Sequence, residues 1–293
     1  MAALRAAAYR PVIICALCYG TGVVFARAAF EDGSNAITVV TVRCTFAALA
    51  IGLALRASSA IPTPPRERGW LLAIGLLFAL NVFTFYKAIE LLRVPLAILL
   101  FYVYPLLSGA FSALAGLERF NRRTLAFGLV SFAGLALATG AAPESVNMLG
   151  VGYALLAAVL IAAILVVSTR YLSHVEAKGR TFWMMASTSA VLICATLAGD
   201  AAAWPESSTG WWAIATVCLL YSVGLVALFT SATRIGPLRT SLIMNVEPII
   251  AIGASWLILG QGLAPVQLIG AALVVAGVIG AQMGKRARAE AAD

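Results

Sequence analysis

Two ionisable side chains lie deep inside long apolar stretches of this sequence, and they are its first candidates for chemistry. Arg43 is about eight residues into the stretch from Ala36 to Leu55, and Glu247 is about nine residues into the stretch from Leu238 to Leu259. In a helix that rises about 1.5 Å per residue, both lie about 12 to 14 Å deep, close to the midplane of a bilayer. Such charges indicate a buried ion pair, a protonated glutamic acid bonded to a neighbouring helix, or a zwitterion-handling or proton-linked site.

Polar and aromatic side chains occupy the same middle layer, and with Arg43 and Glu247 we predict that they line a substrate site. They are Tyr19, Asn81, Tyr104, Tyr221 and Asn245. Phe101 and Ser108 share the face of Tyr104 in a continuous helix, whereas Tyr102 lies half a turn away and is expected to face elsewhere. Aromatic rings with few charges suit a medium-sized, partly apolar solute. A phosphate-bearing substrate would need several basic residues at this depth.

The elements that must position these residues are membrane-spanning helices. Hydrophobic residues make up 62% of the 293 and charged residues 11%, with a mean hydropathy of +0.98, whereas soluble domains have about 25% charged residues. We predict an all-α polytopic membrane protein with ten spans. The spans are 11–29, 36–55, 70–92, 95–115, 124–139, 149–171, 182–198, 211–233, 238–259 and 266–283.

The placement of lysine and arginine predicts the orientation of these spans. Of the 20 basic residues, 16 lie on the side of the membrane that holds the N-terminus, the even-numbered loops and the C-terminus, and only Arg27 and Arg93 lie on the opposite side. Both termini are therefore predicted to be cytoplasmic. The net charge of +8 is explained by this bias, so we expect no nucleic acid as a partner.

The same pattern occurs twice in the chain, 143 residues apart. Four pairs of residues agree at this offset: Arg27 and Arg170, Pro105 and Pro248, Glu118 and Gln261, Gly134 and Gly277. We predict a first five-helix repeat over residues 1–145 and a second over 146–293. Because each repeat has an odd number of spans, the two must have inverted orientations, an arrangement that supports alternating access.

The glycines, prolines and cysteines of the chain each have a different structural or functional explanation. The glycines allow close helix packing. Pro105 and Pro248 each remove one helical hydrogen bond, so we expect a kink near midspan and name both as candidate hinges. The five cysteines all lie within spans, and the single histidine is distant from the C-x-x-C of Cys15 and Cys18. We expect neither a metal site nor a cofactor.

Two pairs of segments resemble a known transporter group. They are YKAIELLRVP and TSATRIGP before the proline-containing spans, and GLERFNRRTLAFGLVSFAG and LGQGLAPVQLIGAALVVAG after them. The chain resembles the drug/metabolite transporter superfamily in its ten-helix EamA-type form, and within it the bacterial YddG-type aromatic amino acid exporters. This resemblance implies a carrier in the bacterial cytoplasmic membrane. The second repeat departs from the pattern with Gln261 where the first has Glu118.

The leading functional prediction is a secondary transporter that exports amino acids, aromatic and other neutral ones, with broad specificity. Its partners are then the small-molecule substrate and the lipid bilayer. A transporter of another metabolite or drug, such as a nucleobase or a lipophilic cation, is the alternative. An intramembrane enzyme or scaffold is a remote one, because the sequence has no H-E-x-x-H, G-x-S-x-G or phosphate-binding loop. Proton coupling, for which Glu247 is the candidate carrier, and facilitated diffusion both fit the sequence.

Overall fold

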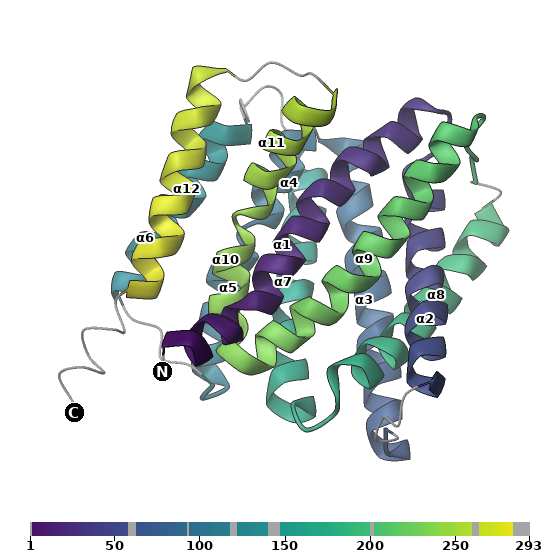
Figure 1. Cartoon of the computed structure of the whole chain (residues 1–293), viewed down its shortest axis with the longest axis horizontal. Coiled ribbons are helices and arrows are strands. Elements are labelled where there is room, and N and C mark those ends of the chain that lie inside the picture. Colours follow the sequence, from purple (N-terminus) through teal and green to yellow (C-terminus); the bar gives the residue numbers. More distant parts are fainter. Residues whose placement is uncertain are drawn as a thin grey trace.

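The computed structural model describes residues 2–57, 63–92, 94–117, 122–139, 147–199, 202–259 and 264–283. Over these ranges the chain is a bundle of helices (Figure 1). The helices are α1 (Ala2–Glu31), α2 (Ala36–Ala57), α3 (Pro65–Leu91), α4 (Val94–Phe101), α5 (Tyr104–Leu114), α6 (Arg122–Thr139), α7 (Met148–Leu172), α8 (Ala177–Gly199), α9 (Ser208–Ile235), α10 (Pro237–Met244), α11 (Glu247–Leu259) and α12 (Pro265–Met283).

The predicted all-helical membrane fold is confirmed. Eight segments are long and apolar enough to cross a membrane, with α4 and α5 forming one crossing and α10 and α11 another. The remaining two crossings, α6 and α12, contain the shorter apolar stretches Leu125–Ala138 and Pro265–Gly280. Helices are the expected solution because a backbone in hydrocarbon must satisfy its own hydrogen bonds.

The fourth and ninth crossings differ from the prediction, because each consists of two helices rather than one kinked helix. The turn between α4 and α5 contains Tyr102 and Val103, and the turn between α10 and α11 contains Asn245 and Val246. In both turns the backbone bonds shorten to the i−3 pattern, with Val103 N donating to the Leu100 carbonyl at 3.2 Å and Val246 N to the Ile243 carbonyl at 3.0 Å. The helix changes direction here because the prolines that follow supply no N–H group.

The two halves of the chain repeat the same arrangement of helices. Adding 143 to the bounds of α4 gives the bounds of α10, and adding 143 to the first residue of α5 gives the first residue of α11, so the breaks coincide at Tyr102 and Asn245. The contacts between helices are paired in the same way: α1 packs against α9 and α11, and its counterpart α7 packs against α3 and α5. The predicted boundary near residue 145, and Glu118 and Gln261, lie outside the described residues.

Helices α6 and α12, which are counterparts in the two repeats, lie side by side at one edge of the bundle (Figure 1). Their backbones meet at glycines. A Cβ atom added to Gly134 would lie 2.6 Å from the backbone nitrogen of Val274, and one added to Gly277 would lie 2.7 Å from the Phe127 carbonyl oxygen. The predicted role of these two glycines in close packing is therefore seen directly.

A polar contact between two loops ties the repeats together at the end of the bundle where α1 meets α2. The Asp32 carboxylate accepts hydrogen bonds from the Ser207 hydroxyl at 2.6 Å and from the Ser207 N–H at 2.9 Å. These bonds lower the pKa of Asp32. This end, which also contains the last residues of α3, α6, α8 and α11, is called the odd-loop end below, and the opposite end is called the even-loop end.

Candidate functional site

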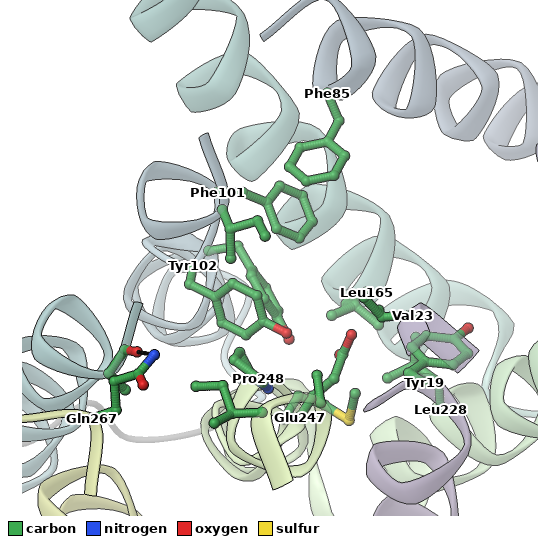
Figure 2. A pocket seen from close by; sticks show the side chains of 16 residues that line it. Tyr19, Val23, Phe85, Phe101, Tyr102, Leu165, Leu228, Glu247, Pro248 and Gln267 are labelled. Carbon is green, nitrogen blue, oxygen red and sulfur yellow. Dashed lines mark hydrogen bonds between the residues drawn. The ribbon is translucent and has the colours of Figure 1, made fainter. Parts of the chain in front are cut away.

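A cavity of about 380 Å³ lies between helices of both repeats. Its size is within the range of about 300–1,000 Å³ that small-molecule sites occupy. Figure 2 shows the side chains that line it. They are Tyr19, Val23, Phe85, Ile98, Phe101, Tyr102, Tyr104, Ala138, Leu165, Leu228, Met244, Glu247, Pro248, Ala251, Ile252 and Gln267. Most are apolar or aromatic, and Glu247 contributes the one carboxyl group among them.

The two helix breaks deliver the polar groups of this cavity. Tyr104 begins α5 and Glu247 begins α11, and these symmetry-related positions both line the cavity. The Tyr102 hydroxyl points toward the Glu247 carboxyl group, with which it interacts electrostatically (Figure 2). The Tyr102 ring belongs to an aromatic cluster, in which the ring centroids of Phe101 and Tyr104 are 5.4 Å apart and those of Tyr102 and Tyr104 are 5.7 Å apart.

The prediction that Tyr102 faces away from Tyr104 is wrong. It assumed one continuous helix, in which residues two apart point to different sides. The turn at Tyr102 and Val103 interrupts the helix, so Tyr102 and Tyr104 both line the cavity. Phe101 lines it as expected, whereas Ser108 is fully buried in α5 and is absent from the lining.

Arg43 lies outside the cavity, in a stack of side chains that ends at the cavity wall. Its guanidinium group is 4.5 Å from the ring centroid of Tyr221. The Tyr221 ring in turn stacks on Tyr19, with centroids 5.7 Å apart and an angle of 13° between the planes. Tyr19 is the member of this stack that lines the cavity. The order of the side chains is therefore Arg43, Tyr221, Tyr19 and cavity.

Arg43 and Glu247 form no salt bridge with each other in the part of the chain that the structure describes. They interact electrostatically over a longer distance, and Nε of Arg43 is buried without a hydrogen-bond partner. The predicted equal depth is thus compatible with the structure, but the direct pair that it suggested is not formed. Cation–π contact with Tyr221 stabilises the guanidinium group instead.

Tyr19 is held against α9 by a glycine. A Cβ atom added to Gly224 would lie 2.7 Å from Cδ1 of the Tyr19 ring. Asn81 occupies the position of Gly224 in the first repeat, and its side chain donates a 2.7 Å hydrogen bond to the Ala157 carbonyl of α7. The same position therefore joins α3 to α7 by a hydrogen bond and brings α9 against α1 by close packing.

The remaining predicted site residues divide between wall and scaffold. Asn245, the counterpart of Tyr102, points away from the cavity and donates to the Ser131 hydroxyl of α6 at 2.9 Å. Pro248 lines the cavity, whereas Pro105 is buried behind it as the second residue of α5. Asn81 and Tyr221 are also absent from the lining. Of the seven predicted substrate-binding residues, the structure brings Tyr19, Tyr104 and Glu247 together around the cavity.

The cavity lies in the half of the bundle nearer the odd-loop end. Ala138 is the second-last residue of α6 and Gln267 is the third residue of α12, and both reach the cavity from that end. Gln267 bridges the two helices, because its amide nitrogen donates to the Ala138 carbonyl at 3.3 Å and its amide oxygen accepts from Ala264 N at 2.9 Å. This side chain is therefore a polar group on the odd-loop side of a mostly apolar cavity.

A buried arginine joins three helices near the even-loop end. Arg180 of α8 is 1% exposed and donates to the carbonyl oxygens of Ser168 and Leu172 at 3.3 Å and of Phe229 at 2.9 Å. These three bonds tie the inner turns of α7, α8 and α9 together. A fourth hydrogen bond, 2.9 Å between the Ser231 and Thr240 hydroxyls, joins α9 to α10.

The comparisons with known proteins identify the family. The sequence model of the EamA-like transporter family matches the chain twice, over residues 9–140 and 148–282. The chain belongs to this family, with one copy in each half, and is therefore a membrane transporter rather than an enzyme. A solved structure titled "Crystal structure of protein" has a TM-score of 0.78 and 21% sequence identity, over 94% of this chain and 98% of that chain. At this identity the likeness shows the fold alone. No curated protein matches the chain.

Proposed function

We propose that this member of the EamA-like transporter family is a secondary transporter that exports amino acids, aromatic ones among them, across the bacterial cytoplasmic membrane. The observation that carries the proposal is the cavity between the two repeats, which combines five aromatic rings with one carboxyl group. An aromatic side chain binds such rings by stacking and apolar burial. An ammonium group binds a carboxylate and the faces of neighbouring rings.

The cavity residues divide these tasks between them. Phe85 and Phe101, whose ring centroids are 4.7 Å apart, form an apolar wall for the substrate side chain. Glu247, with the Tyr102 hydroxyl beside it, receives the substrate ammonium group. The substrate carboxylate is directed toward the odd-loop end, where Gln267 and water solvate it.

Alternating access follows from the repeat. Under the predicted orientation the cavity lies in the extracytoplasmic half, and the hydrogen bonds of Arg180 join α7, α8 and α9 near the cytoplasmic end. If each repeat adopts the helix packing that the other repeat now has, the extracytoplasmic side of the cavity closes and the cytoplasmic side opens. The breaks before Pro105 and Pro248 are the candidate hinges, since a two-residue turn changes direction more easily than a continuous helix does.

Exchange of labelled phenylalanine tests this function directly. The purified protein is placed in liposomes loaded with unlabelled phenylalanine, and uptake of the label is compared across a panel of competing amino acids. We expect saturable uptake that the neutral and aromatic members of the panel inhibit. Phe101→Ala, inside the cavity, should reduce uptake, whereas Phe30→Ala, on the exposed surface of α1, should leave it unchanged. Absence of saturable uptake of any amino acid would contradict the proposal.

A further inference from the structure

The charged side chains that line the cavity are of one sign, negative. Among the lining residues that the structure describes, Glu247 carries a carboxyl group and none is a lysine, an arginine or a histidine. The Glu247 side chain is half-buried and faces the cavity together with the Tyr102 ring (Figure 2), and the Tyr104 ring lines the same cavity. A carboxylate in an apolar cavity is most favourable when a cation neutralises it. The cavity therefore has a built partner for a positive charge.

The described residues of the lining include no matching partner for a negative charge. Arg43 is the cation at the corresponding depth, but Tyr221 and Tyr19 stand between its guanidinium group and the cavity. Tyr19 is fixed in place by its contact with Gly224. A ligand carboxylate that passes Gln267 and reaches the depth of Glu247 must lose water without gaining a charged partner, which is costly in an apolar environment.

The aromatic rings reinforce the same preference. The faces of tyrosine and phenylalanine rings carry partial negative charge, so they attract ammonium groups and repel carboxylates. Tyr102 and Tyr104 flank Glu247, and Phe101 lies within 6 Å of both by ring centroid. The Glu247 carboxyl group and the neighbouring rings therefore both attract a cation.

We propose that the cavity selects one positive charge on an aromatic or apolar body, and that a carboxylate on the ligand adds nothing to binding. The preferred ligands are then aromatic monoamines, with aromatic amino acids accepted through their ammonium group alone. This inference rests on the proposed function only in taking this cavity as the transport site. It narrows the substrate class to amines.

Three ligands with the same phenyl ring and two-carbon chain distinguish the contribution of the ammonium group to binding from that of the carboxylate. Phenethylamine has the ammonium group, phenylalanine has both groups, and 3-phenylpropanoate has the carboxylate. Their dissociation constants are measured by calorimetry with the purified full-length protein in detergent, where passive membrane permeation of the amine has no effect. We expect phenethylamine to bind at least as tightly as phenylalanine, and 3-phenylpropanoate to bind at least about tenfold more weakly, because its charge has no partner.

A matched pair of variants assigns the effect to the cavity carboxyl group. Glu247→Gln should weaken phenethylamine binding by at least about tenfold and remove most of the difference between the three ligands. Glu31→Gln changes a carboxyl group that is exposed and paired with Arg27 at 2.8 Å, so it should change no dissociation constant. Should Glu247→Gln fail to fold, the ranking of the three ligands on the unmodified protein still decides the question.

The outcomes distinguish this inference from the proposed function. If phenylalanine is exchanged in liposomes but phenethylamine does not bind, the inference is overturned and the amino acid function stands. If phenethylamine binds and phenylalanine is neither bound nor exchanged, the amino acid function fails and the inference stands. Binding of 3-phenylpropanoate as tight as that of phenethylamine overturns the inference, and so does a Glu247→Gln protein with an unchanged ranking.

Discussion

Gly270 of α12 offers a sharp test of how the α6–α12 pair shapes the molecule. A Cβ atom at this position would lie 2.6 Å from the carbonyl oxygen of Gly134 and 2.8 Å from Cα of Ala138. Both atoms belong to the α6 backbone, which cannot rotate away as a flexible side chain can. In Gly270→Ala the two helices must therefore separate by several tenths of an ångström or more.

The cost of this separation can be worked from the contacts. Overpacking costs about 1–3 kcal/mol, and a clash against backbone belongs to the upper part of that range, about 2–3 kcal/mol. A protein of this size loses about 2–4 °C of melting temperature per kcal/mol, so we expect a fall of about 4–12 °C. The wall of the cavity should move as well, because Ala138 and Gln267 belong to the two displaced helices.

Gly152→Ala is the matched control, because a Cβ atom at Gly152 of α7 meets nothing within 4 Å. Melting is followed by the loss of the monodisperse peak on size-exclusion chromatography after heating in detergent. The control should melt at or slightly above the temperature of the unmodified protein, since alanine favours a helix over glycine. If Gly270→Ala melts as high as the control, α6 and α12 do not meet as described.

Three further outcomes are expected. Arg180→Leu removes the three hydrogen bonds at the even-loop end and should cost about 1–3 kcal/mol of unfolding free energy in a melting experiment, whereas Arg170→Leu, at an exposed position on α7, should cost little. Asp32→Asn should lower the melting temperature at pH 7 but not at the lowest pH: the Ser207 hydrogen bonds lower the pKa of Asp32, so their contribution is complete above its ordinary pKa and is lost as the pH falls through the lowered value. If protons drive transport, Glu247→Gln should abolish the response to an imposed pH gradient, and unchanged pH dependence with near-normal transport would exclude Glu247 from coupling.

The sequence was sufficient to predict the helices and their repetition. Apolar length determines where a helix can cross, and the bounds of α2 and α12 differ from the predicted spans by at most a few residues. The offset of 143 residues located the two symmetry-related breaks through Pro105 and Pro248. It did not show that each crossing becomes two helices, because a proline within an apolar run is equally compatible with a kink.

The candidate site was harder to predict, because the depth of a residue in the membrane does not determine the direction in which its side chain points. Arg43 and Glu247 lie at similar depth, yet Tyr221 and Tyr19 intervene between Arg43 and the cavity. Tyr102 was excluded by helix geometry that the turn overrides. Its counterpart Asn245, a polar residue at the same point of the second repeat, was the signal that could have drawn attention to it. Apolar wall residues such as Leu228 carry no such signal, because apolar residues occupy most positions in every span, whether or not they face the cavity.

The most direct test of the central claim, that the cavity between the repeats is the substrate site, is a comparison of two added phenyl rings. Ala251→Phe places a ring within the cavity of about 380 Å³, and Ala272→Phe places one on the exposed surface of α12. Exchange of labelled phenylalanine is measured for both in liposomes. The account predicts that Ala251→Phe abolishes exchange and that Ala272→Phe matches the unmodified protein. Undiminished exchange by Ala251→Phe would contradict it.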